Sequence, residues 1–267
     1  MCTLTIVPWH PRGLQSPGVR VVCNRDESVL RPAARPPELR SLGQRQMLAP
    51  IDPVAEGTWI GVSDAPLAGI LMNVYVAQAD PDVIPLASEI PGRLPISRGT
   101  IIPRILAAAD LTHALALADK LEVTRFEPFR LVLVDREHCA EIVWAAEQFS
   151  IGKPQAVTEP LFFTSSGLGD DVVAKPRRAL FEERFSADRD WIAAQDAFHR
   201  HVWPGREFAS VWMTRREART QSITWLEIGS DSVEMRYAAR QGASDEIVFA
   251  PAKLLQRLSQ QNPPGDA

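Results

Sequence analysis

The chain has 267 residues, a formal net charge of −4 and three cysteines. A small negative balance without a basic excess argues against nucleic acid and anionic membranes as main partners. Three cysteines in this length argue against a disulfide framework and for a reducing, cytoplasmic location. No apolar run approaches the roughly 18–20 residues of a transmembrane helix, and Trp9 to Arg12 interrupt the first apolar segment too early for a secretory signal. We expect one domain over residues 1–260 and a disordered tail over 261–267.

The chain begins with two predicted strands. Residues 2–9 are rich in β-branched side chains, and 19–23 are apolar, with a Pro- and Gly-rich turn between them. A hairpin or a neighbouring pair would bring residues 24–27 beside the start of the first strand. Polar residues at a strand end are a common place for functional sites.

Two proline-rich segments surround the next pair of predicted strands. Residues 31–56 have little periodicity and are predicted as a long surface loop. Strands are expected at 57–62 and 68–74, with Asn73 at the end of the second. A further loop at 77–97 follows. We expect the two loops to set specificity.

The rest of the chain alternates between helical and extended patterns. Apolar spacing over 98–121 predicts two helices, with Asp110 near the N-cap of the second. Further strands are predicted at 129–134, 139–144, 161–164, 208–214, 223–228 and 233–239, and helices at 173–185, 190–202 and 252–260. Hairpins outnumber βαβ units, which favours an α+β fold of two layered antiparallel sheets with helices outside.

Cys2 directly follows the initiator methionine. A small residue there normally allows removal of Met1, which would leave Cys2 with a free α-amine. Thiol and amine then place a nucleophile and a base on one residue, with reference pKa values of about 8.5 and 7.7–8.0. Many chains carry a small second residue for no catalytic reason, so Cys2 alone does not establish catalysis.

Several motifs in the same order resemble one known family. They are Met1-Cys2, Asn24-Arg25-Asp26-Glu27, Gly57-Thr58-Trp59-Ile60-Gly61-Val62 and Asn73, followed by Arg98-Gly99, Phe129-Arg130-Leu131-Val132 and Arg219-Thr220-Gln221-Ser222. Together they resemble the NRDE family, also called the transport and Golgi organisation protein 2 family, over nearly the whole chain. That family is similar to the N-terminal nucleophile hydrolases and, more distantly, to the choloylglycine hydrolase and penicillin V acylase group. The resemblance implies a four-layer αββα sandwich and hydrolysis of a non-peptide carbon–nitrogen amide bond.

The resemblance also implies roles beside Cys2, the nucleophile. Arg25 would favour the thiolate, and Asp26 would orient the α-amine. In the acylase group this Arg and Asp stand three residues apart, whereas here they are adjacent and Asn24 and Glu27 keep that spacing. Adjacent residues on a strand point to opposite faces. The sequence leaves open whether Arg25 and Asp26 both reach Cys2 or Asn24 shares the site.

Four further residues complete the expected site. Asn73 matches a position that supplies an oxyanion hydrogen bond in the acylase group. Ser166 stands where the related hydrolases have a second Asn, and is expected to contact substrate with Trp59. Arg219 would bind a substrate anion or pair with Asp26, although on sequence alone it is a solvated charge.

No cofactor and no metal are expected. His199 and His201 would lie about 200° apart around a helix and could not chelate one ion. The expected partner is a small-molecule amide, or an acyl or haem-like ligand if the protein is instead a non-catalytic carrier. The family's eukaryotic members are linked to membrane traffic, lipid and haem handling, so a membrane-traffic factor is a further alternative. The sequence does not give the oligomeric state.

Overall fold

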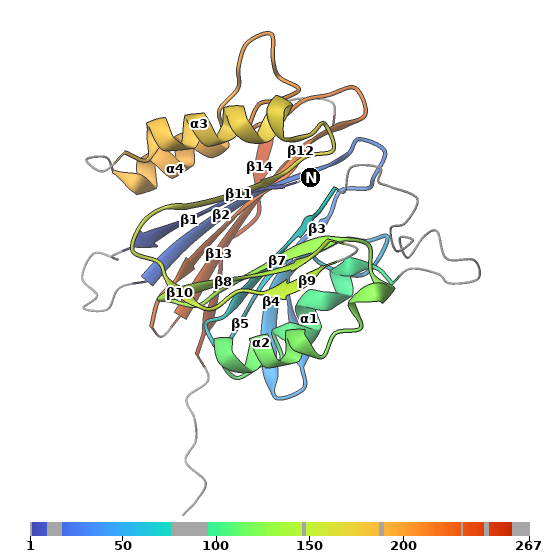
Figure 1. Ribbon diagram of the computed structural model, residues 1–267, viewed down its shortest axis with the longest axis vertical. Coiled ribbons are helices and arrows are strands. Elements are labelled where there is room, and N and C mark those ends of the chain that lie inside the picture. The colour runs from blue at the N-terminus through green and yellow to red at the C-terminus, as the bar shows by residue number, and fades with distance from the viewer. Residues whose placement is uncertain are drawn as a thin grey trace, which may run out of the picture.

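A computed structural model describes residues 2–9, 18–75, 96–145, 148–186, 190–230, 232–242 and 246–257. Two antiparallel sheets stack face to face, and helices cover both outer faces (Figure 1). This confirms the expected α+β sandwich with four layers.

The first sheet carries the N-terminal strand next to one of its edges. Its order is β11 (Leu161–Ser165), β1 (Cys2–Trp9), β2 (Gly18–Ser28), β12 (Ala218–Ile228), β13 (Ser232–Arg240) and β14 (Ile247–Phe249), and β15 (Lys253–Gln256) also pairs with β13. Its outer face is covered by α3 (Lys175–Arg184) and α4 (Trp191–His199). A short π-helical turn, η3 (Asp170–Ala174), leads into α3.

The second sheet is built mainly from the middle of the chain. Its order is β10 (Gln155–Ala156), β8 (His138–Trp144), β7 (Phe129–Val134), β6 (Ala68–Asn73), β5 (Ile60–Ser63), β4 (Arg45–Ile51) and β3 (Arg35–Leu42), with β9 (Phe149–Ile151) paired to β8. The helices on its outer side are α1 (Ile101–Ile105) and α2 (Leu111–Asp119), with the 3-10 turns η1 (Arg98–Thr100) and η2 (Val123–Arg125). Asp110 caps α2 as expected, because its side chain accepts from the His113 amide.

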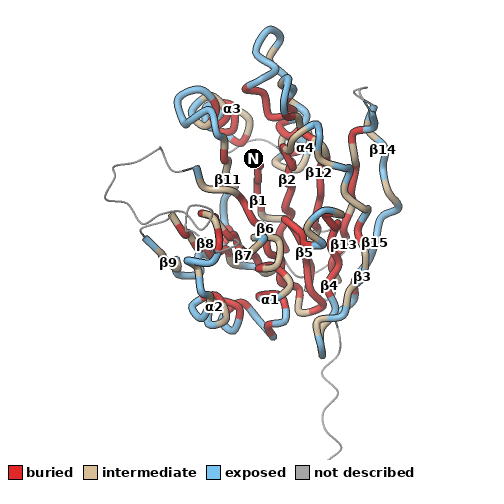
Figure 2. Tube along the Cα trace, turned by 90° about the vertical axis from the view of Figure 1, so that its right-hand side faces the viewer, coloured by how far each residue is buried: buried red, intermediate tan, exposed pale blue. Residues whose placement is uncertain are grey.

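The alternation of β1 shows why the sheets stack. Cys2, Leu4 and Ile6 belong to the apolar core between the two sheets, whereas Thr3 and Thr5 contact side chains of α3 and α4. Separate apolar clusters fill the space between each sheet and its helices. Buried residues follow the strands of both sheets (Figure 2). Each large apolar side chain buried in this way contributes about 1.5–3 kcal/mol.

The segment expected to be a surface loop at 31–56 is mostly strand, so that prediction is wrong. It contains β3 and β4, and β3 forms the edge of the second sheet. Proline has no backbone N–H to donate, and an edge strand tolerates it because one side of that strand has no neighbouring strand to bond. Pro36 and Pro37 fall where the register with β4 shifts, between Arg35 and Glu38. The irregular register and the polar face of β3 removed the alternation that would have marked a strand.

Three other boundaries differ from prediction. β2 runs on to Ser28, so residues 24–27 lie within a strand rather than at its end. Residues 208–214 form a loop with one isolated bridge, from Thr214 to Arg219. The apolar side chains of this loop are buried without a ladder, except for the exposed Phe208. The helix expected at 252–260 is wrong where it can be compared, since β15 occupies 253–256. Most of the 77–97 loop, positions 258–260 and the 261–267 tail fall outside the described residues.

Within the described ranges, the structure contains no helix of the length and apolarity needed to span a membrane.

A buried histidine links α4 to β1 and β2. His199 Nε2 lies 2.7 Å from Thr5 Oγ1, and its Nδ1 lies 2.8 Å from Asn24 Oδ1. Burial, helped by the positive charges of Arg20 and Arg177, lowers the pKa of His199 well below its usual range. His199 is therefore a neutral, hydrogen-bonded ring in the core.

This histidine should make stability depend on pH. An unfolded histidine has a pKa of about 6.5, so as pH falls the unfolded chain takes up the proton before the folded one does. The stabilisation is complete above that pKa and is lost as pH falls toward the lowered folded pKa. We expect this group to reduce the free energy of unfolding by up to about 1.4 kcal/mol per pH unit below about pH 6.5. Urea denaturation at several pH values gives the free energy of unfolding as a function of pH. This free energy should change less steeply with pH in His199→Gln than in the wild type, and an equal pH dependence would contradict the assignment.

Candidate active site

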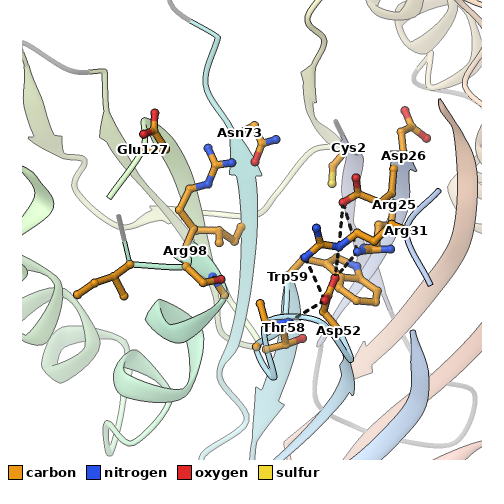
Figure 3. A pocket seen from close by; sticks show the side chains of 17 residues that line it. Cys2, Arg25, Asp26, Arg31, Asp52, Thr58, Trp59, Asn73, Arg98 and Glu127 are labelled. Carbon is orange, nitrogen blue, oxygen red and sulfur yellow. Dashed lines mark hydrogen bonds and ion pairs between the residues drawn. The ribbon is translucent and has the colours of Figure 1, made fainter. Parts of the chain in front are cut away.

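A pocket of about 400 Å³ opens beside the first residue of β1, between residues of both sheets (Figure 3). Cys2, Trp59, Thr58 and Asn73 line it. Its charged lining residues are Arg25, Asp26, Glu27, Arg31, Asp52, Arg98 and Glu127. Cys2 therefore faces a pocket lined by three arginines and four carboxylates.

Cys2 is held by strands on both sides. It pairs in register with Arg25 of β2 and with Ser165 of β11. Its backbone nitrogen donates to the Ser165 hydroxyl at 3.2 Å. The residue is 6% exposed, so its thiol is largely shielded from water while it still lines the pocket.

The thiol of Cys23 is a hydrogen-bond partner of the Cys2 thiol. Cys23 lies diagonally across the β1–β2 ladder, because Leu4 is its register partner. A hydrogen bond from Cys23 lowers the pKa of Cys2 against the opposing effect of burial, and the charge of Arg25 contributes in the same direction. The same hydrogen bond raises the pKa of Cys23 well above its usual range. Of the two thiols, Cys2 is therefore the one poised to ionise.

Arg25 lies on the pocket side of β2 within a compact charge cluster. Its Nη2 is 2.7 Å from Asp52 Oδ2 and 3.3 Å from Glu27 Oε2. Arg31 Nε binds the same Asp52 oxygen at 2.6 Å. The guanidinium of Arg25 also covers the ring of Trp59, 4.4 Å from its centroid. These contacts hold Arg25 beside Cys2, its register partner, with the ring of Trp59 packed against its guanidinium.

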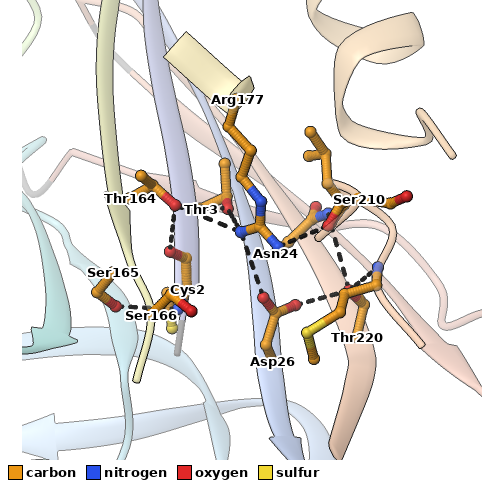
Figure 4. A network of polar contacts seen from close by, with 12 residues as sticks. Cys2, Thr3, Asn24, Asp26, Thr164, Ser165, Ser166, Arg177, Ser210 and Thr220 are labelled. Carbon is orange, nitrogen blue, oxygen red and sulfur yellow. Dashed lines mark hydrogen bonds and ion pairs between the residues drawn. The ribbon is translucent and has the colours of Figure 1, made fainter. Parts of the chain in front are cut away.

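Asp26 enters a second, buried network on the helix side of the sheet (Figure 4). Its Oδ1 accepts from Thr220 Oγ1 at 2.6 Å, and its Oδ2 lies 3.5 Å from Arg177 Nη1. Arg177, on α3, is 1% exposed and also donates to Thr3 Oγ1 and to the Ser210 carbonyl. Burial lowers the pKa of Arg177, and the charge of Asp26 opposes that shift.

The structure answers the question of which side chains share the face of Cys2. Arg25 and Glu27 do, whereas Asp26 points to the helix side and reaches the pocket lining from there. Asn24 does not lie at the pocket. Its amide donates to the carbonyls of His199 and Val211, both at 2.9 Å, so its interactions hold the loop and α4 against β2.

The remaining expected residues divide in the same way. Asn73 ends β6 and lines the pocket from the second sheet, with its amide 3.4 Å from the Tyr75 hydroxyl. Ser166 accepts from the Leu168 amide and from Arg215, and does not line this pocket. Arg219 lies opposite Glu27 in the ladder and donates to Gln221, also outside the lining.

The sequence assigned no role to several residues at or beside the site. They are Ser165, Arg31, Asp52, Arg98 and Arg177. Arg98 had a signal in its Arg-Gly motif, since Gly57 and Gly99 pack backbone to backbone. Arg177 stands on a charged helix with nothing in its pattern to separate it from Arg178, and only the tertiary structure selects it. No cluster of three or more potential metal ligands occurs in the described ranges.

Two stacked antiparallel sheets lie between helical layers, and Cys2 opens β1 of the first sheet at the pocket. The Transport and Golgi organisation 2 family model matches residues 1–190, and the chain belongs to that family. A search of curated proteins returns no match.

Comparison with solved structures gives one similar fold. A Caenorhabditis elegans N-acylethanolamine-hydrolyzing acid amidase ortholog is similar with a TM-score of 0.51 and 14% identity, covering 84% of this chain and 92% of that one. A mutant conjugated bile acid hydrolase from Clostridium perfringens has a TM-score of 0.46 and 11% identity, with 93% and 96% covered. At such identities the first likeness shows the fold alone.

Proposed function

We propose that this protein is an amidohydrolase that cleaves a non-peptide carbon–nitrogen bond, with Cys2 as its N-terminal nucleophile. The observation that supports this most is the place of Cys2. It opens β1, its thiol lines the pocket with a lowered pKa, and its nitrogen contacts Ser165. The similar Caenorhabditis elegans structure is named as an acid amidase ortholog, which agrees with the proposal.

The proposed reaction proceeds through a thioester. Removal of Met1 would turn the Cys2 nitrogen into an α-amine that takes the thiol proton, and the sulfur would attack the amide carbonyl. The tetrahedral intermediate would expel the amine, which receives that proton as it leaves. Water would then attack the thioester, with the α-amine as base, to release the carboxylic acid and restore the thiol. Arg25 would favour the thiolate, and Asp26 would contribute negative charge near the α-ammonium.

Asn73 is the proposed donor to the oxyanion. Its side chain lines the pocket from the sheet opposite Cys2, and one preorganised donor of this kind is typically worth about 100- to 1000-fold in rate. We expect Asn73→Ala to lower kcat by about that factor with little change in KM. Steady-state kinetics would check this, and a variant with unchanged kcat would remove Asn73 from the mechanism.

The activity is tested with a panel of small N-acyl amides, by release of the free amine. The chain should be compared with a version carrying a cleavable peptide ahead of Cys2, which blocks the α-amine. We expect hydrolysis only after cleavage of that peptide exposes Cys2. Equal hydrolysis before and after cleavage would contradict an N-terminal nucleophile.

The carrier and membrane-traffic alternatives have less support from the pocket. Seven of its lining residues are charged, which does not suit an acyl chain or a haem-like ring as sole ligand. Saturable binding of such a ligand that persists in Cys2→Ala, without any turnover by the wild type, would favour the carrier. We also propose a cytoplasmic location, supported by the three free thiols of Cys2, Cys23 and Cys139.

A further inference from the structure

Arg98 occupies the wall of the pocket across from the nucleophile. Figure 3 shows Arg98 and Cys2 on opposite sides, with Asn73 between them. Its backbone is fixed by the contact of two glycines. A Cβ on Gly57 would lie 2.8 Å from Gly99 backbone atoms, and Thr58 donates to the Gly99 carbonyl at 3.1 Å. This close approach, which only glycine permits, presents Arg98 to the pocket.

The three arginines of the pocket differ in how their charge is compensated. Arg25 and Arg31 both bind Asp52. Arg98 is half-buried, and its one hydrogen bond among the described residues goes from Nη1 to the Pro128 carbonyl at 2.7 Å. No carboxylate in the described ranges comes within ion-pair distance of it. Glu127 and Glu27 favour its charged form only from farther away, and burial lowers the pKa of Arg98.

We propose that Arg98 binds a carboxylate carried by the substrate amide, so that the enzyme selects anionic amides. This inference rests on the proposed function. A guanidinium offers five donors in a planar fork that matches a carboxylate, and only one of these donors has a partner among the described residues. Asn73, between Arg98 and Cys2, places the proposed oxyanion contact between the anion site and the sulfur. A substrate would therefore extend from the reacting carbonyl at Cys2 to its carboxylate at Arg98.

The test is a binding measurement that does not depend on catalysis. Isothermal titration of Cys2→Ala uses two matched pairs of ligands. N-hexanoylglycine and N-hexanoylglycinamide carry or lack the carboxylate on the amine side. On the acyl side, the N-propyl monoamide of glutaric acid carries the carboxylate, and the matching terminal carboxamide lacks it. We expect one carboxylate to bind about tenfold or more tightly than its carboxamide, as a charged hydrogen-bonded contact predicts.

Variants assign that preference to Arg98. Arg98→Gln in the same background should remove the preference and leave carboxamide binding unchanged, while Arg98→Lys should keep part of it. Arg104→Gln is the matched control, because Arg104 is exposed on α1 and outside the pocket lining. The proposal is overturned if neither carboxylate binds better than its carboxamide, or if the preference survives Arg98→Gln.

The outcome is separable from that of the proposed function. If carboxylate binding depends on Arg98 while the wild type turns over no amide, that result would support the anion site and contradict the proposed hydrolase activity. Turnover that depends on Cys2 but is the same with and without the carboxylate would support the hydrolase activity and contradict the anion site.

Discussion

Cys2→Ala is expected to abolish amide turnover, with a loss of about 10⁴-fold or more, while the fold is retained. Removal of a nucleophile leaves only the contribution of binding and of the oxyanion donor. The side chain is small and lies at the start of β1, so its loss should cost little stability. Circular dichroism and thermal unfolding would confirm the fold, and single-turnover kinetics would measure the rate.

The other two cysteines supply matched controls. Cys139 lies in β8, where burial raises its pKa to about 12, and Cys139→Ala should keep full turnover. Cys23→Ala should keep turnover but shift its pH dependence upward, because the hydrogen bond from Cys23 helps to lower the pKa of Cys2. Substantial turnover by Cys2→Ala would exclude the nucleophile proposed here.

Arg177→Met is expected to be the most destabilising single change outside the apolar core. Arg177 joins α3 to Thr3 on β1, to Thr164 on β11, to the carbonyls of Ala209 and Ser210, and to Asp26. Removing the cation that contacts a buried carboxylate typically costs about 3–5 kcal/mol. Urea denaturation at neutral pH should show this loss.

Two further variants separate the charge from the packing. Arg178→Met, on the next residue of α3, is exposed and should change stability by less than about 1 kcal/mol. The double variant Arg177→Met with Asp26→Asn should recover part of the loss, because the buried charge is removed together with its partner. If the double variant is as unstable as the sum of the singles, the Arg177–Asp26 pair is not the cause.

The sequence was most informative where local pattern and tertiary fold agree. The strands around Cys2 followed from β-branched and apolar content, the two helices over 98–121 from helical spacing, and the layered sheets from the excess of hairpins. β3 was missed because prolines and an irregular register at a sheet edge leave no alternation. The 208–214 segment was misassigned because most of its apolar residues are buried by packing without a strand ladder.

The candidate site was predictable only in Cys2 and the residues nearest to it. Cys2, Arg25, Asp26, Trp59 and Asn73 all line the pocket. Asn24 was expected there because strand pairing alone does not say which face turns toward which layer. The charge pairs made by Asp52 and Arg177 join residues from distant parts of the chain, and no local pattern encodes them.

The central claim is that the mature chain begins at Cys2 and that this residue is the reactive thiol. Intact mass of the purified protein, before and after brief treatment with iodoacetamide and followed by peptide mapping, tests both parts at once. We predict a chain lacking Met1 that is labelled first at Cys2, ahead of Cys23 and Cys139. A chain that keeps Met1, or a label that reaches Cys23 or Cys139 as quickly, would contradict the account.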